Sequence, residues 1–174
     1  MANEARALAH LIDVESAPAI NLLGPALQFL IGPDATESPC IMRGTIPPGM
    51  VVPLHSHADP ETFFMVSGEL EGLSYDATDL RWITIAPGGI FNVPSNAKHA
   101  FRNNGREPAV TIIVSTSRIG RFFQEIGVPV VPGTPTQTMP SSQQIQRFLE
   151  TSARYGYWNA SPEENARIGI VVAV

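Results

Sequence analysis

Between about Ala19 and Thr116 the chain consists of short apolar runs separated by Pro, Gly, Asn and Asp. This pattern is typical of many strands joined by tight turns, and no helical period interrupts it. Pro47-Pro48-Gly49 and Pro87-Gly88-Gly89 are strong breakers, and a strand has to end at each. The predicted strands are Ala26–Ile31, Cys40–Ile46, Met50–His55, Thr62–Ser67, Glu69–Tyr75, Trp82–Ile85, Gly89–Val93, Ala100–Arg102 and Ala109–Thr116. So many short strands without intervening helices indicate an antiparallel sandwich or barrel.

After Thr116 the hydrophobic period changes to that of helices. Ile119, Phe122, Phe123 and Ile126 fall on one helical face, and Gly127 follows as a stop signal. A Pro-rich linker is expected over 128–140.

Two further helices are predicted from their starting residues. Ser141 and Gln144 form a capping box for a helix that ends near Tyr155, before Gly156. Ser161 followed by Pro162 is a second N-cap signal. We therefore expect a β domain over 1–116 and a helical extension over 117–174.

The helical extension needs a surface to pack on. Its apolar stripes and its last segment, IGIVVAV (168–174), are too hydrophobic to remain in water. Two interpretations stay open. The extension packs on its own barrel, or it packs on a partner subunit, where the last segment adds a strand across a dimer interface.

Composition excludes several classes of partner. The chain has 174 residues, 16% of them charged, with a net charge of −5. It therefore offers no basic surface for nucleic acid or for anionic lipid headgroups. No apolar stretch is long enough to span a bilayer, and residues 1–13 lack the features of an export signal, so a cytoplasmic protein is expected. The single Cys40 argues against zinc fingers and iron–sulfur sites, and is interpreted as a small buried hydrophobic residue.

Histidines carry the candidate chemistry. His55 and His57 are separated by one residue in an extended segment, so their side chains point to the same face. A metal ion would satisfy two imidazoles that converge in an interior. Glu61, beyond a Pro that ends the strand, could return a carboxylate to this place, and His99 could bring a third imidazole from a distant strand. Taken singly, each has an ordinary interpretation as a surface or hydrogen-bonded core residue.

The spacing of these residues within two longer segments favours the interpretation as metal ligands. The segments GMVVPLHSHADPETFFMVSG (49–68) and GGIFNVPSNAKHAFRN (88–103) resemble the two motifs of the cupin superfamily. The resemblance covers about residues 41–114 and implies an all-β protein, a double-stranded β-helix (jelly-roll) barrel, with the C-terminal helical extension added. A single pair of motifs is typical of a single-domain cupin. One framework position departs from the family, because Asn96 stands where a Gly is usual; Asn tolerates a left-handed backbone better than other non-Gly residues, so the turn is expected to survive.

The resemblance also implies a cofactor and a site. By position, the ligands of one divalent transition metal ion (Fe, Mn, Ni, Cu, Co or Zn) would be His55, His57, Glu61 and His99. Cupins commonly form dimers, so a homodimer is expected. A closed zinc site with a purely structural role is the alternative.

Strand parity suggests what surrounds the metal. Phe63 and Met65 share the parity of Glu61, and Phe101 shares that of His99, so an apolar pocket wall is expected, unless these residues are ordinary barrel core. Such a pocket suits a small enolic, phenolic or diketone substrate.

The predicted function is a metal-dependent dioxygenase resembling quercetinase, in which Glu61 serves as ligand and as catalytic base. Two alternatives remain: a non-redox metal-dependent isomerase, lyase or hydrolase, and a small-molecule binding cupin without turnover.

Overall fold

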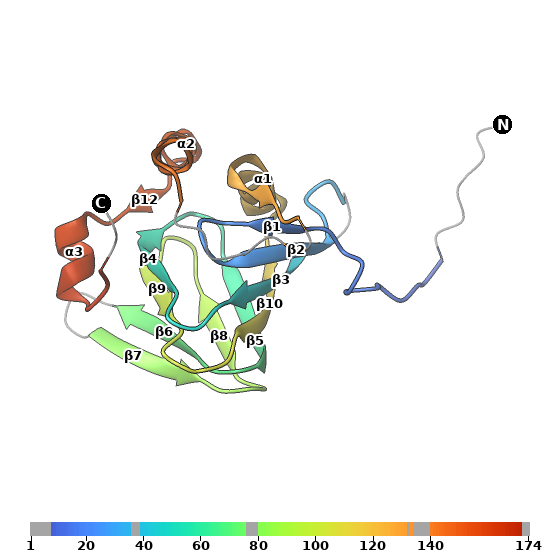
Figure 1. Ribbon diagram of the computed structural model, residues 1–174, viewed down its shortest axis with the longest axis horizontal. Coiled ribbons are helices and arrows are strands. Elements are labelled where there is room, and N and C mark those ends of the chain that lie inside the picture. The colour runs from blue at the N-terminus through green and yellow to red at the C-terminus, as the bar shows by residue number, and fades with distance from the viewer. Residues whose placement is uncertain (1–7, 36–38, 76–79, 132, 134–139, 172–174) are drawn as a thin grey trace.

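The computed structural model describes residues 8–35, 39–75, 80–131, 133 and 140–171. Two antiparallel sheets face each other and enclose the core, and helices cover one end and one side of them (Figure 1). The expected all-β barrel with a C-terminal helical extension is confirmed.

Among the residues that the structure describes, the larger sheet has seven strands and the smaller has five. The seven-stranded sheet runs in the order β11 (Val128–Pro129), β1 (Ala19–Asn21), β2 (Ala26–Ile31), β3 (Cys40–Ile46), β10 (Ala109–Ser115), β5 (Glu61–Ser67) and β8 (Ile90–Val93). The five-stranded sheet runs in the order β12 (Trp158–Asn159), β4 (Val51–Ser56), β9 (His99–Arg102), β6 (Leu70–Tyr75) and β7 (Leu80–Ile85).

The main core lies between the two sheets. Met42 and Met65 come from the larger sheet, Leu70 and Phe101 from the smaller, and all four are at most 4% exposed. Along β3 buried and partly buried residues alternate without exception, as expected for a strand with one face on the core. Cys40 is fully buried there, and burial raises the pKa of its thiol to about 11, so it behaves as a small hydrophobic residue.

The nine predicted strands are all present, with ends shifted by no more than two residues. The predictions missed three short strands, β1, β11 and β12, because two or three residues are too few to show a period. β11 falls in the predicted linker; residues 132 and 134–139 of that linker lie outside the described part of the chain.

In the described part of the chain, three helices follow the barrel: α1 (Ser117–Ile126), α2 (Ser142–Tyr155) and α3 (Pro162–Arg167). Both α2 and α3 begin with complete capping boxes, at Ser141 and Ser161, which confirms the predicted starts. Gly127 follows α1 as predicted, but it does not form a left-handed cap. Its backbone is extended (φ −69°), and a Cβ there would come within 2.5 Å of the Ile20 side chain, so the absence of a side chain lets β1 approach.

The end of the extension packs on its own chain. Ile168 and Ile170 are buried with Leu54, Leu73 and Ala100 in a second small core. Val171 is 88% exposed, and the last three residues of the apolar segment lie outside the described chain. In the described part of the chain these contacts are intramolecular.

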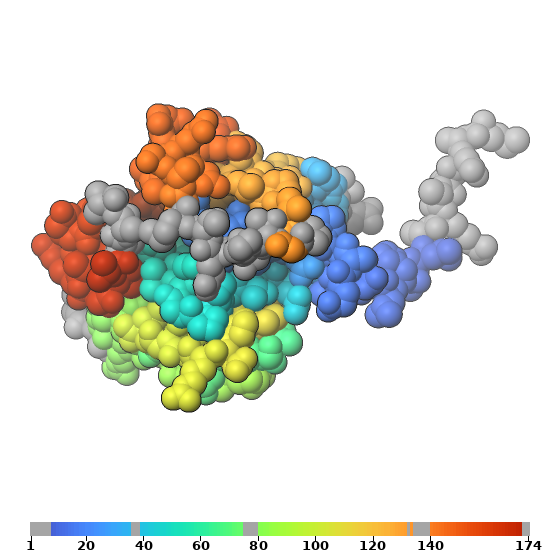
Figure 2. Space-filling model, viewed as in Figure 1, coloured from blue at the N-terminus to red at the C-terminus, as the bar shows by residue number. Residues whose placement is uncertain are grey.

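The N-terminal segment from residue 8 leaves the barrel and extends away from it (Figure 2). Leu8 and Leu11 are 74% and 95% exposed. Among the described residues, no helix has both the length and the apolar character needed to cross a membrane.

Candidate metal centre

Three strands bring the candidate ligands to one end of the barrel. His55 lies near the end of β4, His57 lies just beyond it, and His99 begins β9, where it is paired directly with His55. Glu61 is the first residue of β5 in the opposite sheet. The site is therefore assembled between the two sheets, from segments that are distant in the sequence.

The four side chains lie close together. The ring centroids of the histidines are 4.1 to 5.5 Å apart, and one nitrogen of each lies within 4.8 Å of the others. The Glu61 carboxylate oxygen Oε2 lies 3.3 Å from His57 Nε2 and 3.5 Å from His99 Nε2. The three histidines are thus positioned to hold a metal ion, and the fourth predicted residue lies beside two of them.

Main-chain carbonyls fix the tautomers of the three clustered histidines. Nδ1 of His55, His57 and His99 donates to a carbonyl oxygen two residues away, at 2.7, 2.8 and 2.9 Å. A carbonyl can only accept, so each Nδ1 carries the hydrogen and each Nε2 of a neutral ring keeps its lone pair. This arrangement leaves the Nε2 lone pairs available as metal ligands and orients the rings, as is common for metal-binding histidines.

Two of these lone pairs have no partner among the described residues. His57 Nε2 and His99 Nε2 are buried without a hydrogen bond. In neutral rings with the hydrogen on Nδ1, both atoms are acceptors, as is the Glu61 carboxylate beside them. Leaving buried polar atoms unsatisfied is costly. Imidazole nitrogens and a carboxylate oxygen are common ligands of divalent transition metals, so the residues present fit such an ion.

His55 resists protonation. Burial, together with repulsion from His99 and His57, lowers the pKa of His55 to about 3. His55 is therefore neutral and able to act as a ligand throughout the physiological range.

Glu61 supplies the negative charge of the site. Burial alone would raise the pKa of the Glu61 carboxyl, but His57 and His99 outweigh burial and lower it. For His57 the balance is the reverse: burial opposes protonation, and Glu61 overcomes it and raises the pKa. The Glu61 carboxylate is consequently ionised at neutral pH, although Glu61 is only 4% exposed.

The three predicted pocket residues point inward. Phe63, Met65 and Phe101 are 6%, 4% and 2% exposed and belong to the main core. The Phe101 ring lies 4.6 Å from that of Phe63 and 5.9 Å from that of His99, so a pair of apolar rings begins beside one of the histidines. Whether they contact a substrate stays a prediction.

Asp59 and Tyr157 belong to the same region and were missed in the sequence. Asp59 lies between His57 and Glu61 in the sequence, and Tyr157 places its ring 5.1 Å from that of His57. Tyr157 OH donates to Asp59 Oδ2 at 2.6 Å. The position of Asp59 inside the first motif was an available signal, whereas nothing in the spacing of Tyr157, nearly a hundred residues later, connects it to the site.

The motif residues that are not ligands shape the barrel end. Gly68 has φ +71°, and a Cβ on it would lie 2.3 Å from the carbonyl oxygen of Pro108, so only Gly fits. Asn103 is fully buried, and its amide donates to the carbonyls of Ile46 and Glu107 while its oxygen accepts from Gly105 N–H.

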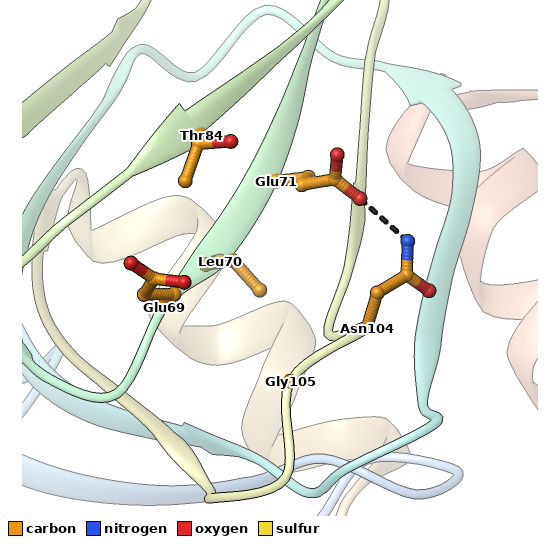
Figure 3. A pocket seen from close by; sticks show the side chains of 6 residues that line it. All are labelled: Glu69, Leu70, Glu71, Thr84, Asn104 and Gly105. Carbon is orange, nitrogen blue, oxygen red and sulfur yellow. Dashed lines mark hydrogen bonds between the residues drawn. The ribbon is translucent and has the colours of Figure 1, made fainter.

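A cavity of about 250 Å³ lies elsewhere on the barrel, beside β6 and β7 (Figure 3). Glu71, one of the residues that line it, already accepts from Arg102 Nε at 2.7 Å and from Asn104 Nδ2 at 2.6 Å. Because this carboxylate is engaged and none of the histidines lines the cavity, the histidine cluster remains the candidate centre.

The fold and the site together define a class: an antiparallel double-stranded β-helix barrel with imidazoles gathered between its two sheets. Residues 42–115 match the Cupin domain family, and this part of the chain has the fold of a cupin domain. No curated protein is detectably similar to the chain in sequence.

Solved structures agree with this assignment. A predicted oxalate decarboxylase from Thermotoga maritima has 19% identity and a TM-score of 0.53, over 62% of this chain and 98% of that one. A sugar phosphate isomerase of the cupin superfamily from Silicibacter pomeroyi has 19% identity and a TM-score of 0.52, over 62% and 75%. The oxalate decarboxylase of Lactobacillus farciminis has 19% identity and a TM-score of 0.51, over 59% and 32%. At this identity the likeness concerns the fold alone.

Proposed function

We propose that this protein binds one divalent transition metal ion through His55, His57, His99 and Glu61. The observation that carries the proposal is the convergence of three imidazoles whose Nδ1 hydrogens are all engaged, two of which have buried and unpartnered Nε2 atoms. Three nitrogens and one carboxylate oxygen suit Fe, Mn, Ni, Cu, Co and Zn.

We further propose that the protein is a dioxygenase acting on a small enolic, phenolic or diketone substrate. With four protein ligands, a six-coordinate ion would keep two positions for substrate and O2, and would polarise the substrate oxygen bound to it. The buried, apolar rings of Phe63 and Phe101 favour a planar, weakly charged substrate. Both oxygen atoms of O2 would end in the products, so no further reductant is needed.

Glu61 has the properties of the base in this proposal. Its carboxylate is ionised because His57 and His99 lower its pKa, and it is buried beside the imidazole nitrogens. It would accept the acidic enol or phenol proton of a substrate bound at the centre and return it to the product.

The experiment is O2 uptake by metal-loaded protein, measured with an oxygen electrode on a flavonol and on a 1,3-diketone. We expect O2 consumption in step with product formation, and a loss of kcat of at least about 100-fold in Glu61→Gln. Glu69→Gln changes an exposed carboxylate away from the histidines and serves as the control. Turnover that proceeds without O2 would replace the dioxygenase with a non-redox isomerase, lyase or hydrolase, and tight binding of these compounds without product would indicate a binding protein.

A further inference from the structure

The loop between His57 and Glu61 is held from outside the barrel. Asp59, in the middle of this loop, is 4% exposed, and its main-chain carbonyl accepts the Nδ1–H of His57 at 2.8 Å. The position of the loop therefore sets the rotation of the His57 ring and the direction of its Nε2 lone pair.

The Asp59 carboxylate accepts hydrogen bonds from three residues that lie beyond residue 115. Oδ2 accepts from Tyr157 OH at 2.6 Å and from Arg118 Nη1 at 2.8 Å, and Oδ1 accepts from the hydroxyl of Thr116. These residues belong to the N-cap and first turn of α1 and to the segment after α2. Ser115 adds a second attachment, because its hydroxyl donates to the Pro60 carbonyl at 2.7 Å.

Tyr157 connects this loop to the rest of the extension. It is 9% exposed and lies between the rings of His57 and Phe122, at 5.1 and 4.8 Å. The next two residues form β12, which pairs with His55 and Ser56 at the end of β4. The extension thus contacts both sides of the His-x-His segment.

From this arrangement we propose that Asp59 and Tyr157 are positioning residues through which the C-terminal extension sets the geometry of the metal centre. Asp59 reaches the metal ligand through its main chain, so it acts without contacting the ion. The inference rests on the metal site proposed above, and it assigns to the helical extension a role in metal affinity and coordination geometry.

The test compares two tyrosine variants that each lose one hydroxyl. Tyr157→Phe removes a hydrogen bond to Asp59, whereas Tyr155→Phe removes a bond of the same length, 2.6 Å, to Glu125 on the surface. Asp59→Asn keeps the main-chain carbonyl and the side-chain shape while removing the charge. For each protein, Co²⁺ affinity is measured by competition with a chelator, and the visible absorption spectrum of the Co²⁺ form reports the ligand geometry.

We expect Tyr157→Phe and Asp59→Asn to weaken Co²⁺ binding roughly tenfold and to shift the absorption bands. Tyr155→Phe should match the wild type in both. Wild-type affinity and spectrum in Tyr157→Phe would overturn the inference, and so would an equal change in Tyr155→Phe, which would indicate general loosening.

A second measurement does not depend on metal. In the metal-free protein, ¹H–¹⁵N NMR reads the Nδ1 hydrogen of His57 and its exchange with water. We expect a slowly exchanging Nδ1–H in the wild type and in Tyr155→Phe, and fast exchange in Tyr157→Phe. If the wild type failed to bind Co²⁺, the proposed function would be wrong, and this measurement would still decide the positioning role: equal exchange in all three proteins would contradict it.

Discussion

Asn96 adopts a left-handed backbone with φ +63°, in the turn that leads to His99. Its main-chain N–H donates to the carbonyl of His57 at 2.7 Å, so this turn also contacts the ligand-bearing segment. The structure confirms the conformation expected from the sequence, where Asn replaces the Gly usual in the family. Asn is the side chain that best tolerates this region.

We therefore predict that Asn96→Ala lowers the free energy of unfolding by about 1 kcal/mol, because Ala has no polar side chain to compensate the strain. Asn96→Gly should stay within about 0.5 kcal/mol of the wild type, since Gly adopts this conformation freely. Urea unfolding of the metal-free proteins measures both. Equal losses in the two variants would show that the amide side chain, and not the backbone conformation, matters at this position.

Glu71 gives the second prediction at this scale. The Arg102 guanidinium beside it holds the pKa of the Glu71 carboxyl below its usual value of 4.5. A lowered pKa means that the ionised group stabilises the fold above about pH 4.5, and that this contribution is lost as the pH falls below it.

Glu71→Gln should therefore cost about 1 kcal/mol of unfolding free energy at pH 7, and the difference from wild type should shrink on acidification. Urea titrations at pH 7 and at about pH 3.5 measure the change, with Glu69→Gln, an exposed neighbour, as the control. A constant difference between the two pH values would contradict the assigned ion pair.

At the scale of elements, helix α1 packs closely against β3 at Gly120. A Cβ on Gly120 would lie 2.7 Å from Cys40 Sγ on β3 and 2.9 Å from the ring of Pro33. Both neighbours are fully buried, so neither has room to move.

Gly120→Ala should accordingly lower the unfolding free energy by about 1–3 kcal/mol, although Ala is the better helix former. The matched control is Gly32→Ala, where a Cβ meets nothing within 4 Å. Thermal unfolding compares the two, and a stabilised Gly120→Ala variant would show that α1 can shift away from β3.

Most elements could be predicted from local signals, and those without such signals could not. The capping boxes at Ser141 and Ser161 predicted α2 and α3 because the bonds that start a helix lie within four residues. β12 carries no comparable signal: Trp158 and Asn159 become a strand only because β4 offers them a free edge. Gly127 shows the same limit, since the residue that excludes its side chain, Ile20, is distant in the sequence.

At the scale of the whole molecule, the spacing of two motifs was enough to predict which side chains come together. His55, His57, Glu61 and His99 do meet, because strand register converts sequence spacing into position. The attachment of Asp59 to Tyr157 was not predictable, because it depends on how the extension packs on the barrel. The expected homodimer stays a prediction.

The packing of the extension allows a test of whether its last segment belongs to a dimer interface. Ile168 and Ile170 are buried against the same chain, and Trp82 Nε1 donates to the Ile168 carbonyl at 3.2 Å. Removing residues 168–174 should therefore lower the unfolding free energy by about 4 kcal/mol, from the loss of two buried isoleucines.

The same truncation should leave a dimeric mass in analytical ultracentrifugation, because Ile168 and Ile170 are buried against their own chain. Val171→Ser, at an 88% exposed position, is the control and should change neither quantity. Dissociation of a wild-type dimer into truncated monomers would place this segment in the interface instead.

The metal content of the purified protein tests the central claim most directly. We predict one equivalent of a divalent transition metal by elemental analysis of protein prepared without a polyhistidine tag. Less than about a tenth of that amount should remain in His99→Ala, because a ligand from one side of the site is lost. His10→Ala is the matched control, since His10 is exposed on the N-terminal segment. A wild-type protein that takes up no metal, or a His99→Ala variant that retains a full equivalent, would contradict the account.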